Sequence, residues 1–166
     1  MKTTYFSVVL LAFVTLTIAM PSCKKDKVRG CMNSVATNYA ETATEDDGSC
    51  VFRRDKFIGD FTGSRNCSID TLDSLITMSV VVNDIDFNKV NLVNFPEDGI
   101  TVVANVKPEN EYGLKIEAQT ITHGTDVYSI TGEGTYEGTD QLLILNIEKN
   151  RSGIIESCGI GVNKVQ

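Results

Sequence analysis

From Asp55 onward, apolar and polar residues alternate with a period of two, which is the pattern of a β-strand with one buried face. Turn-forming residues separate the runs. The pattern predicts about eight strands and no helix: residues 57–67, 76–82, 89–92, 100–106, 114–119, 128–136, 141–149 and 154–164. Short connections favour antiparallel neighbours. We therefore expect an all-β domain over residues 55–166, an eight-stranded antiparallel meander closed as a small barrel or flattened into a sandwich.

One face of these strands carries the large apolar side chains that would point inward. The glycines in Gly132-Glu133-Gly134 interrupt the strand they share, which indicates a bend or a close backbone approach. An eight-stranded barrel is either filled by its own side chains or holds one small ligand. The residues that would fill the centre or line such an apolar pocket are Phe57, Phe61, Met78, Leu114, Ile116, Tyr128 and Tyr136.

The chain has five cysteines, so one of them lacks an intramolecular partner. Cys23 is the natural odd one, and the other four can pair in three ways. Proximity favours Cys31 with Cys50, and Cys67 with Cys158. Strand parity supports the second pair, because both sulfurs would face inward from the first and last strands. A bridge closing roughly ninety residues is worth about 4 to 5 kcal/mol in the chain-entropy model.

The N-terminal residues 1–22 have the organisation of a signal peptide, with Lys2 followed by an apolar run. Cys23 comes directly after them, in Met20-Pro21-Ser22-Cys23, which resembles the lipobox of bacterial lipoproteins. The resemblance implies that Cys23 is acylated, for example with palmitate, and becomes the mature N-terminus. Residues 23–29 would then be a short tether on the membrane. We expect a cell-envelope protein held on the outer membrane by its lipid, facing either the periplasm or the exterior.

Residues 30–52 form a short cysteine-bounded unit, too small to build a core without its bridge. The stretch resembles a motif of secreted and surface proteins of the Bacteroidota, of the form Gly-Cys followed by Asn-Tyr and ending in Asp-Asp-Gly-Ser-Cys. Hard cations such as calcium prefer carboxylate and amide oxygens. The candidate calcium ligands are Asn33, Asn38, Asp46 and Asp47. The alternative is that these side chains cap turns through hydrogen bonds to the backbone.

A second resemblance rests on Phe57-Ile58-Gly59-Asp60-Phe61 with a cysteine ending the strand, on Asn88-Lys89-Val90, and on residues 116–121. These features are similar to the lipocalin-like domain of small Bacteroidota lipoproteins. The similarity implies a lipocalin-like β-barrel.

Charge and chemistry narrow the function. The net charge is −7, and no basic face is evident, so nucleic acid is not expected as a partner. His123 is the only histidine and falls in an expected turn, which argues against a histidine metal site or a nucleophile-base pair. Asp70-Thr71-Leu72 and Asp73-Ser74-Leu75 match a short O-glycosylation pattern, with Thr71 and Ser74 as acceptors.

The sequence thus predicts a non-enzymatic, lipid-anchored binding or structural module. Its partner would be a protein, a glycan or a small apolar ligand. The alternative is a carrier of a small apolar molecule inside the barrel. No cofactor is required by the sequence, with calcium as the candidate ion.

Overall fold

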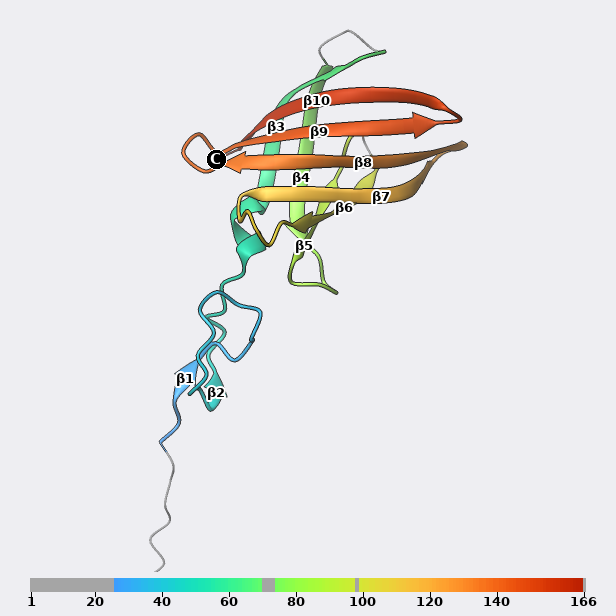
Figure 1. Ribbon diagram of the computed structural model, residues 1–166. Coiled ribbons are helices and arrows are strands. Elements are labelled where there is room, and N and C mark those ends of the chain that lie inside the picture. Colours follow the sequence, from blue (N-terminus) through green and yellow to red (C-terminus); the bar gives the residue numbers. More distant parts are fainter. Residues whose placement is uncertain (1–25, 70–73, 98, 166) are drawn as a thin grey trace, which may run out of the picture.

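The computed structural model describes residues 26–69, 74–97 and 99–165. Eight antiparallel strands form a closed barrel in the order β10-β3-β4-β5-β6-β7-β8-β9 (Figure 1). The predicted all-β fold and the closed meander are confirmed. The barrel strands are β3 Gly59–Cys67, β4 Ser74–Val82, β5 Lys89–Val93, β6 Thr101–Val106, β7 Gly113–His123, β8 Asp126–Glu137, β9 Leu142–Arg151 and β10 Ile154–Lys164.

Strands β3 and β10 close the barrel, although they lie at opposite ends of the domain sequence. Their register runs from Cys158 opposite Cys67 to Lys164 opposite Phe61. Cys67 and Cys158 are bonded to each other, as are Cys31 and Cys50, so the favoured pairing is confirmed. Both sulfurs of the barrel bridge face inward, with exposures of 5% and 4% for the two residues.

The predicted strand 57–67 begins later than expected, at Gly59, because a 3-10 helix precedes it. This helix, η1 Arg53–Phe57, ends in Phe57, whose side chain is fully buried. The expectation of no helix was therefore wrong for this one turn. Arg54 of η1 is also buried, and its Nη1 donates to the carbonyl oxygens of Asn83, Asp86 and Lys89. The helix is thereby fixed to the β4–β5 connection.

The two ends of the barrel differ. We call the end that carries η1, the β4–β5, β6–β7 and β8–β9 connections and the end of β10 the proximal end. The distal end carries the β3–β4, β5–β6, β7–β8 and β9–β10 connections. The cysteine-bounded unit of residues 30–52, which we call the small unit, precedes η1 and lies beyond the proximal end (Figure 1). The distal end consequently points away from the N-terminal part of the chain.

All seven predicted inward side chains belong to one buried core. The Tyr136 ring lies 5.8 Å from Phe57 and 6.4 Å from Phe61 between ring centroids, so three aromatic rings pack together inside the barrel. The inward glycines permit close strand contact, as predicted for Gly132: a Cβ there would collide with the carbonyl oxygen of Asn146. This part of the interior is filled by side chains from β3, β8 and η1.

The β6–β7 pairing is the shortest among the barrel strands described. Only two register pairs join the strands, Asn105 with Lys115 and Val106 with Leu114. Beyond them β7 has a register irregularity against β8 between Ile116 and Gln119. The side chain of Gln119 spans the gap: its Oε1 accepts from the Val103 N–H at 3.0 Å, and its Nε2 donates to the Val103 carbonyl at 2.8 Å.

The small unit contains two short parallel strands, β1 Arg29–Gly30 and β2 Glu45–Asp46. The Thr44 N–H donates to the Val28 carbonyl, and Lys27 pairs with Glu45 at 3.0 Å. Residues 27–29, expected to belong to the tether, therefore contact this unit. Among the residues described, none lies in a helix long and apolar enough to span a membrane.

Candidate functional site at the distal end of the barrel

A polar cluster occupies the distal end of an otherwise apolar interior. Alternation turns Arg65 of β3, Tyr128 of β8, Lys149 of β9 and Glu156 of β10 to the inner side of their strands. Glu97 joins them from the β5–β6 connection. We call these five residues the distal mouth. Strand parity turns the four strand residues inward. They lie near the strand ends, beyond the apolar layers of the interior.

Ion pairs connect the charged members of the distal mouth. Lys149 Nζ lies 2.8 Å from a Glu97 oxygen and 3.0 Å from a Glu156 oxygen. Lys149 and Glu156 are also direct cross-strand partners in the β9–β10 register. Arg65 lies 3.9 Å from Glu97, and its Nη1 donates to the Pro96 carbonyl at 2.9 Å. Two cations and two carboxylates thus balance within the distal mouth.

Burial and pairing shift the pKa values of this network. Burial alone would raise the pKa of Glu97, but the hydrogen bond and the charge of Lys149, together with Arg65, lower it overall. Burial alone would lower the pKa of Lys149, but its hydrogen bonds to Glu97 and Glu156 raise it overall. Both groups are held in their charged forms at neutral pH.

Tyr128 lies beneath these charges. The residue is 5% exposed, and Lys149 Nζ is 5.6 Å from the centroid of its ring. The buried hydroxyl has no hydrogen-bond partner. Burial raises the pKa of this phenol, and the negative charge of Glu97 raises it further. A buried hydroxyl without a partner costs free energy, so it is a group that an additional acceptor would satisfy.

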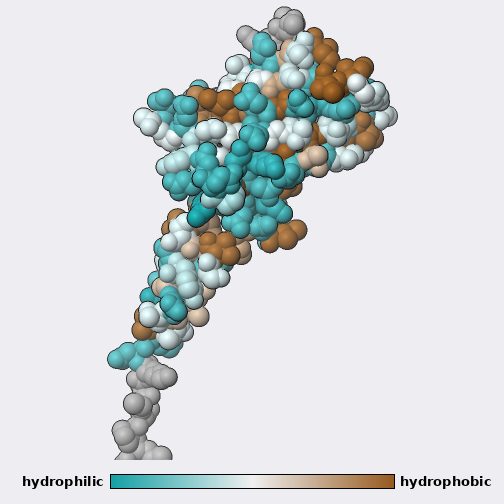
Figure 2. Space-filling model, viewed as in Figure 1, coloured by the Kyte–Doolittle hydropathy of each residue, from teal (hydrophilic) through white to brown (hydrophobic). Residues whose placement is uncertain are grey.

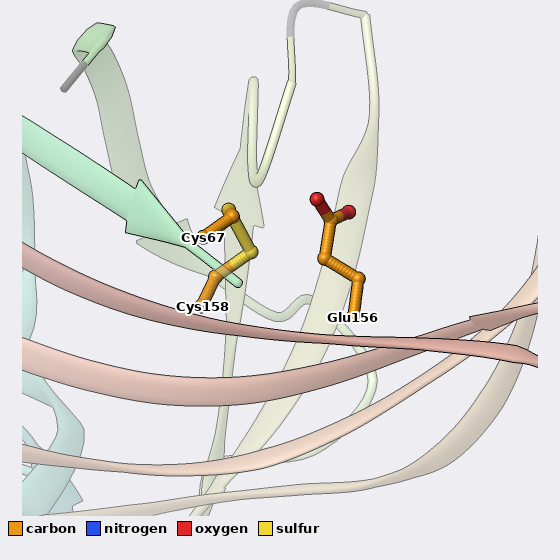
Figure 3. Close-up of side chains that lie close together, drawn as sticks. All are labelled: Cys67, Glu156 and Cys158. Carbon is orange, nitrogen blue, oxygen red and sulfur yellow. A yellow bond between two sulfur atoms is a disulfide. The ribbon is translucent and has the colours of Figure 1, made fainter. Parts of the chain in front are cut away.

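The Cys67–Cys158 bridge lies next to Glu156 (Figure 3). The carboxylate and the two sulfurs lie within 4.8 Å of one another, a spacing that could hold a metal ion. The sulfurs are bonded to each other, however, and metal ligation requires thiolates. In the oxidised protein the three residues are a structural bridge beside a carboxylate.

Exposed apolar side chains surround the distal mouth. Figure 2 shows hydrophobic residues gathered on the part of the barrel farthest from the small unit. Ile69 and Ile154, together with Lys149, Arg151 and Glu156, line a depression of about 210 Å³. The exposed residues at the distal strand ends are Ile69 59%, Leu75 82%, Val127 55%, Ile154 62% and Ile155 59%.

The predicted apolar pocket residues are brought together as packed core. Their exposures are Phe57 0%, Phe61 0%, Met78 1%, Leu114 0%, Ile116 0%, Tyr128 5% and Tyr136 7%. Four surface hollows of about 650, 1000, 270 and 210 Å³ border the described part of the chain, and of the seven residues only Tyr136 lines one of them. These hollows lie on the outside of the packed core.

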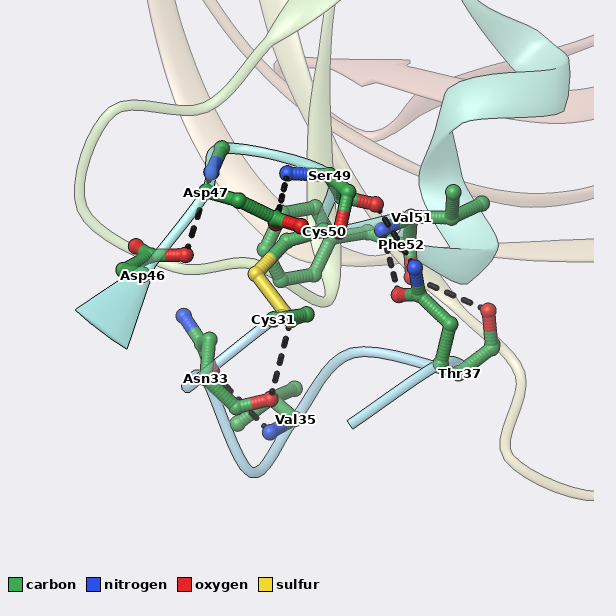
Figure 4. Close-up of a disulfide and its surroundings, with 12 residues drawn as sticks. Cys31, Asn33, Val35, Thr37, Asp46, Asp47, Ser49, Cys50, Val51 and Phe52 are labelled. Carbon is green, nitrogen blue, oxygen red and sulfur yellow. Dashed lines mark hydrogen bonds between the residues drawn. A yellow bond between two sulfur atoms is a disulfide. The ribbon is translucent and has the colours of Figure 1, made fainter. Parts of the chain in front are cut away.

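The four candidate calcium ligands each bond to turn backbone, which Figure 4 shows for Asn33, Asp46 and Asp47. Asn33 Oδ1 accepts from the Val35 N–H, Asp46 Oδ1 from the Gly48 N–H, and Asp47 Oδ1 from the Ser49 N–H. The hydrogen bond to Ser49 lowers the pKa of Asp47.

Asn38 uses both ends of its amide, donating to the Ser49 carbonyl at 2.6 Å and accepting from the Val51 N–H at 2.8 Å. This is the geometry of the turn-capping alternative. Calcium binding stays a prediction.

Cys23 and Thr71 lie outside the described residues. Ser74 begins β4, and its Oγ accepts from Arg65 Nε at 3.3 Å. The proposed acceptor hydroxyl at Ser74 therefore contacts the distal mouth. Lipidation at Cys23 and glycosylation at Thr71 and Ser74 stay predictions.

Sequence reasoning missed the distal mouth. Arg65, Lys149 and Glu156 share strand parity with the inward cysteines and apolar residues, so their inward direction was readable from alternation. Glu97 lies in the β5–β6 connection, where strand alternation gives no direction for its side chain. Comparisons of the chain with protein-family models, with curated proteins and with solved structures give no match.

Proposed function

We propose that this chain is a lipid-anchored cell-envelope protein whose barrel acts as a non-enzymatic binding module. A closed antiparallel barrel is compatible with binding or carriage. The observation that carries the proposal is the distal mouth, where an unpartnered buried hydroxyl lies among charged groups at the end of the barrel away from the small unit. An anchor at Cys23 would leave that end directed away from the membrane.

The electrostatics of the distal mouth support binding over catalysis. A general acid or base works best with a pKa near the operating pH. Glu97 and Lys149 are shifted in the opposite sense, with the Glu97 pKa lowered and the Lys149 pKa raised. Both groups are stabilised as permanent charges, which suits recognition or structure better than proton transfer.

Anchoring is tested by Cys23→Ser in the native host, with Ser22→Ala as the matched control. We expect Cys23→Ser to move the protein from the membrane to the soluble fraction and to abolish incorporation of an alkyne-labelled fatty acid. Ser22→Ala should keep both. The anchor would be refuted if Cys23→Ser stayed in the membrane fraction and if neither Cys23→Ser nor the Ser22→Ala control took up the acyl label.

Carriage of a small apolar ligand is the second candidate function, and the continuous apolar interior favours it. Against it, the rings of Phe57, Phe61 and Tyr136 already pack together, and the charged distal mouth lies over the interior. A fluorescent fatty acid titrated into the protein separates the two functions. Saturable one-to-one binding that disappears in Ile116→Glu, which places a charge inside the barrel, would establish the carrier.

A further inference from the structure

We propose that the distal mouth binds an uncharged apolar segment of a polypeptide, and that the Tyr128 hydroxyl donates a hydrogen bond to a peptide carbonyl of that segment. The inference rests on the proposed binding function and names its partner class. It makes Tyr128, which the sequence suggested only as an apolar lining residue, a polar recognition residue.

The first observation is the hydroxyl itself. Tyr128 is 5% exposed and its oxygen has no hydrogen-bond partner. Lys149 Nζ lies over the Tyr128 ring, and Lys149 also lines the 210 Å³ depression, so we take a movement of this one side chain as the step that opens the hydroxyl to a ligand in the depression. An acceptor arriving there would satisfy a group that the free protein leaves unpaired.

The second observation is the charge around the hydroxyl. Lys149 pairs with Glu97 and Glu156, and Arg65 pairs with Glu97, so no cation of the distal mouth is left uncompensated. Burial raises the pKa of Tyr128, and the negative charges of Glu97 and Asp126 raise it further against the opposing effect of Lys149. A carboxylate ligand would be repelled by Glu97 and Asp126, whereas a neutral carbonyl oxygen would not.

The third observation is the apolar surroundings. Ile69 and Ile154 line the depression and are 59% and 62% exposed. Exposed apolar groups that cluster together mark interaction sites. A depression of about 210 Å³ is smaller than the roughly 300 to 1,000 Å³ of small-molecule sites, which suits one side chain of a larger partner.

A polypeptide supplies both groups together, because each apolar side chain lies next to a neutral carbonyl acceptor. Backbone amides also carry no net charge, in agreement with the balanced distal mouth. The side of the barrel that carries this surface points away from the small unit, where a partner has access (Figure 1).

The test uses the mature chain from residue 23 carrying Cys23→Ser, labelled with ¹⁵N and titrated with N-acetyl-leucine amide and with N-acetyl-leucine. The two probes share the apolar side chain and differ in a neutral amide against a carboxylate. We expect N-acetyl-leucine amide to shift the amide resonances of Tyr128, Lys149 and Ile154 and to bind at least fivefold more tightly than N-acetyl-leucine.

Tyr128→Phe removes only the hydroxyl. We expect this variant to bind N-acetyl-leucine amide about five- to tenfold more weakly, the value of one hydrogen bond. Its Tm should rise, because a buried unsatisfied oxygen is gone. Tyr112→Phe, at an exposed proximal tyrosine, should change neither quantity. A weaker affinity of Tyr128→Phe for the amide together with a higher Tm would show that the hydroxyl serves recognition. A merely structural hydroxyl would lower the Tm when it is removed.

The proposal is overturned if Tyr128→Phe binds the amide as tightly as the parent protein, or if its Tm falls. Tighter binding of N-acetyl-leucine would also overturn it and assign the site to an anion. Concentration-dependent dimers in sedimentation that shift the same resonances would assign the surface to a second copy. Saturable binding of a fluorescent fatty acid without any response to the amide would overturn this inference and leave the binding function standing.

Discussion

The side-chain amide of Gln119 hydrogen bonds to both the N–H and the C=O of Val103, in the place where a neighbouring strand would have done so. Strands β6 and β7 share only two register pairs, so this glutamine extends their connection beyond the backbone ladder. The bulge after Ile116 brings Gln119 to this position. One side chain thus completes a weak junction in the barrel wall.

Gln119→Ala should lower the free energy of unfolding by about 1 to 3 kcal/mol, because the Val103 N–H and C=O lose their partners. Gln119→Glu keeps the acceptor and loses the donor, so an intermediate loss is expected. Urea denaturation gives the free energies, and amide exchange at Val103 should accelerate in Gln119→Ala. Unchanged exchange at Val103 would show that the junction does not depend on this amide.

Removing the barrel bridge should destabilise the domain more than removing the bridge of the small unit. The Cys67→Ser/Cys158→Ser variant opens a loop with a sequence separation of 91, against 19 for Cys31→Ser/Cys50→Ser. The chain-entropy model gives a loss of about 4 to 5 kcal/mol for the longer loop and about 3 kcal/mol for the shorter one.

The location of each loss should also differ. Only Cys67→Ser/Cys158→Ser should shift the urea midpoint of the barrel. Far-ultraviolet circular dichroism measures this midpoint. An equal shift from both pairs would mean that the small unit and the barrel unfold together.

Arg54→Ala should be much more harmful than Arg53→Ala at the neighbouring position. Arg54 is buried and satisfies three carbonyl oxygens, whereas exposed Arg53 donates to one, that of Pro108. We expect a loss of about 2 to 4 kcal/mol for Arg54→Ala and less than about 1 kcal/mol for Arg53→Ala. Thermal or urea unfolding measures both, and equal losses would contradict the role assigned to η1.

Acid should weaken the distal mouth through Glu97. Its pKa is lowered in the folded protein, so its contribution is present above the unfolded pKa, near 4.3, and is lost as the pH falls through the folded pKa. Lys149 has a raised pKa, so its contribution is complete below the unfolded value near 10.4 and is lost only as the pH rises through the folded pKa. Neither group should change stability between about pH 5 and pH 10.

Glu97→Gln tests this dependence. Below about pH 4, the Tm of the parent protein should fall more steeply than that of Glu97→Gln. The corresponding difference in the free energy of unfolding should be less than about 1 kcal/mol, because Glu97 is partly exposed. Glu137→Gln, an exposed substitution at the proximal end, should follow the parent. Identical acid profiles for the parent and Glu97→Gln would show that the ion pairs contribute nothing measurable.

Alternation made the barrel predictable because each strand buries one face and exposes the other. The same parity placed Cys67 and Cys158 inward and supported their bridge. The 3-10 helix could not be read this way, since Phe57 continues the apolar alternation of β3 while its backbone belongs to η1. Local periodicity reports which side is buried and not the backbone dihedrals of a single turn.

The distal mouth was hidden for a related reason. Inward charged residues break the apolar pattern, and at strand ends they look like the start of a polar turn. The contacts of Glu97 with Arg65 and Lys149 join residues separated by 32 and 52 positions in sequence, which only the closed barrel brings together. The role of Gln119 was hidden in the same way. Its partner, Val103, is free to bond to it only because the β6–β7 backbone pairing ends early, and the sequence does not show where that pairing ends.

The meeting of β3 with β10 also has a consequence while the chain is being synthesised. Until the last strand is present, β3 has a free edge that can pair with another molecule, and open edges promote association. Chains truncated before Ile154 would expose β3 and β9 at once. The eleven residues of β10 therefore cover the edges of β3 and β9 and so protect the protein against aggregation.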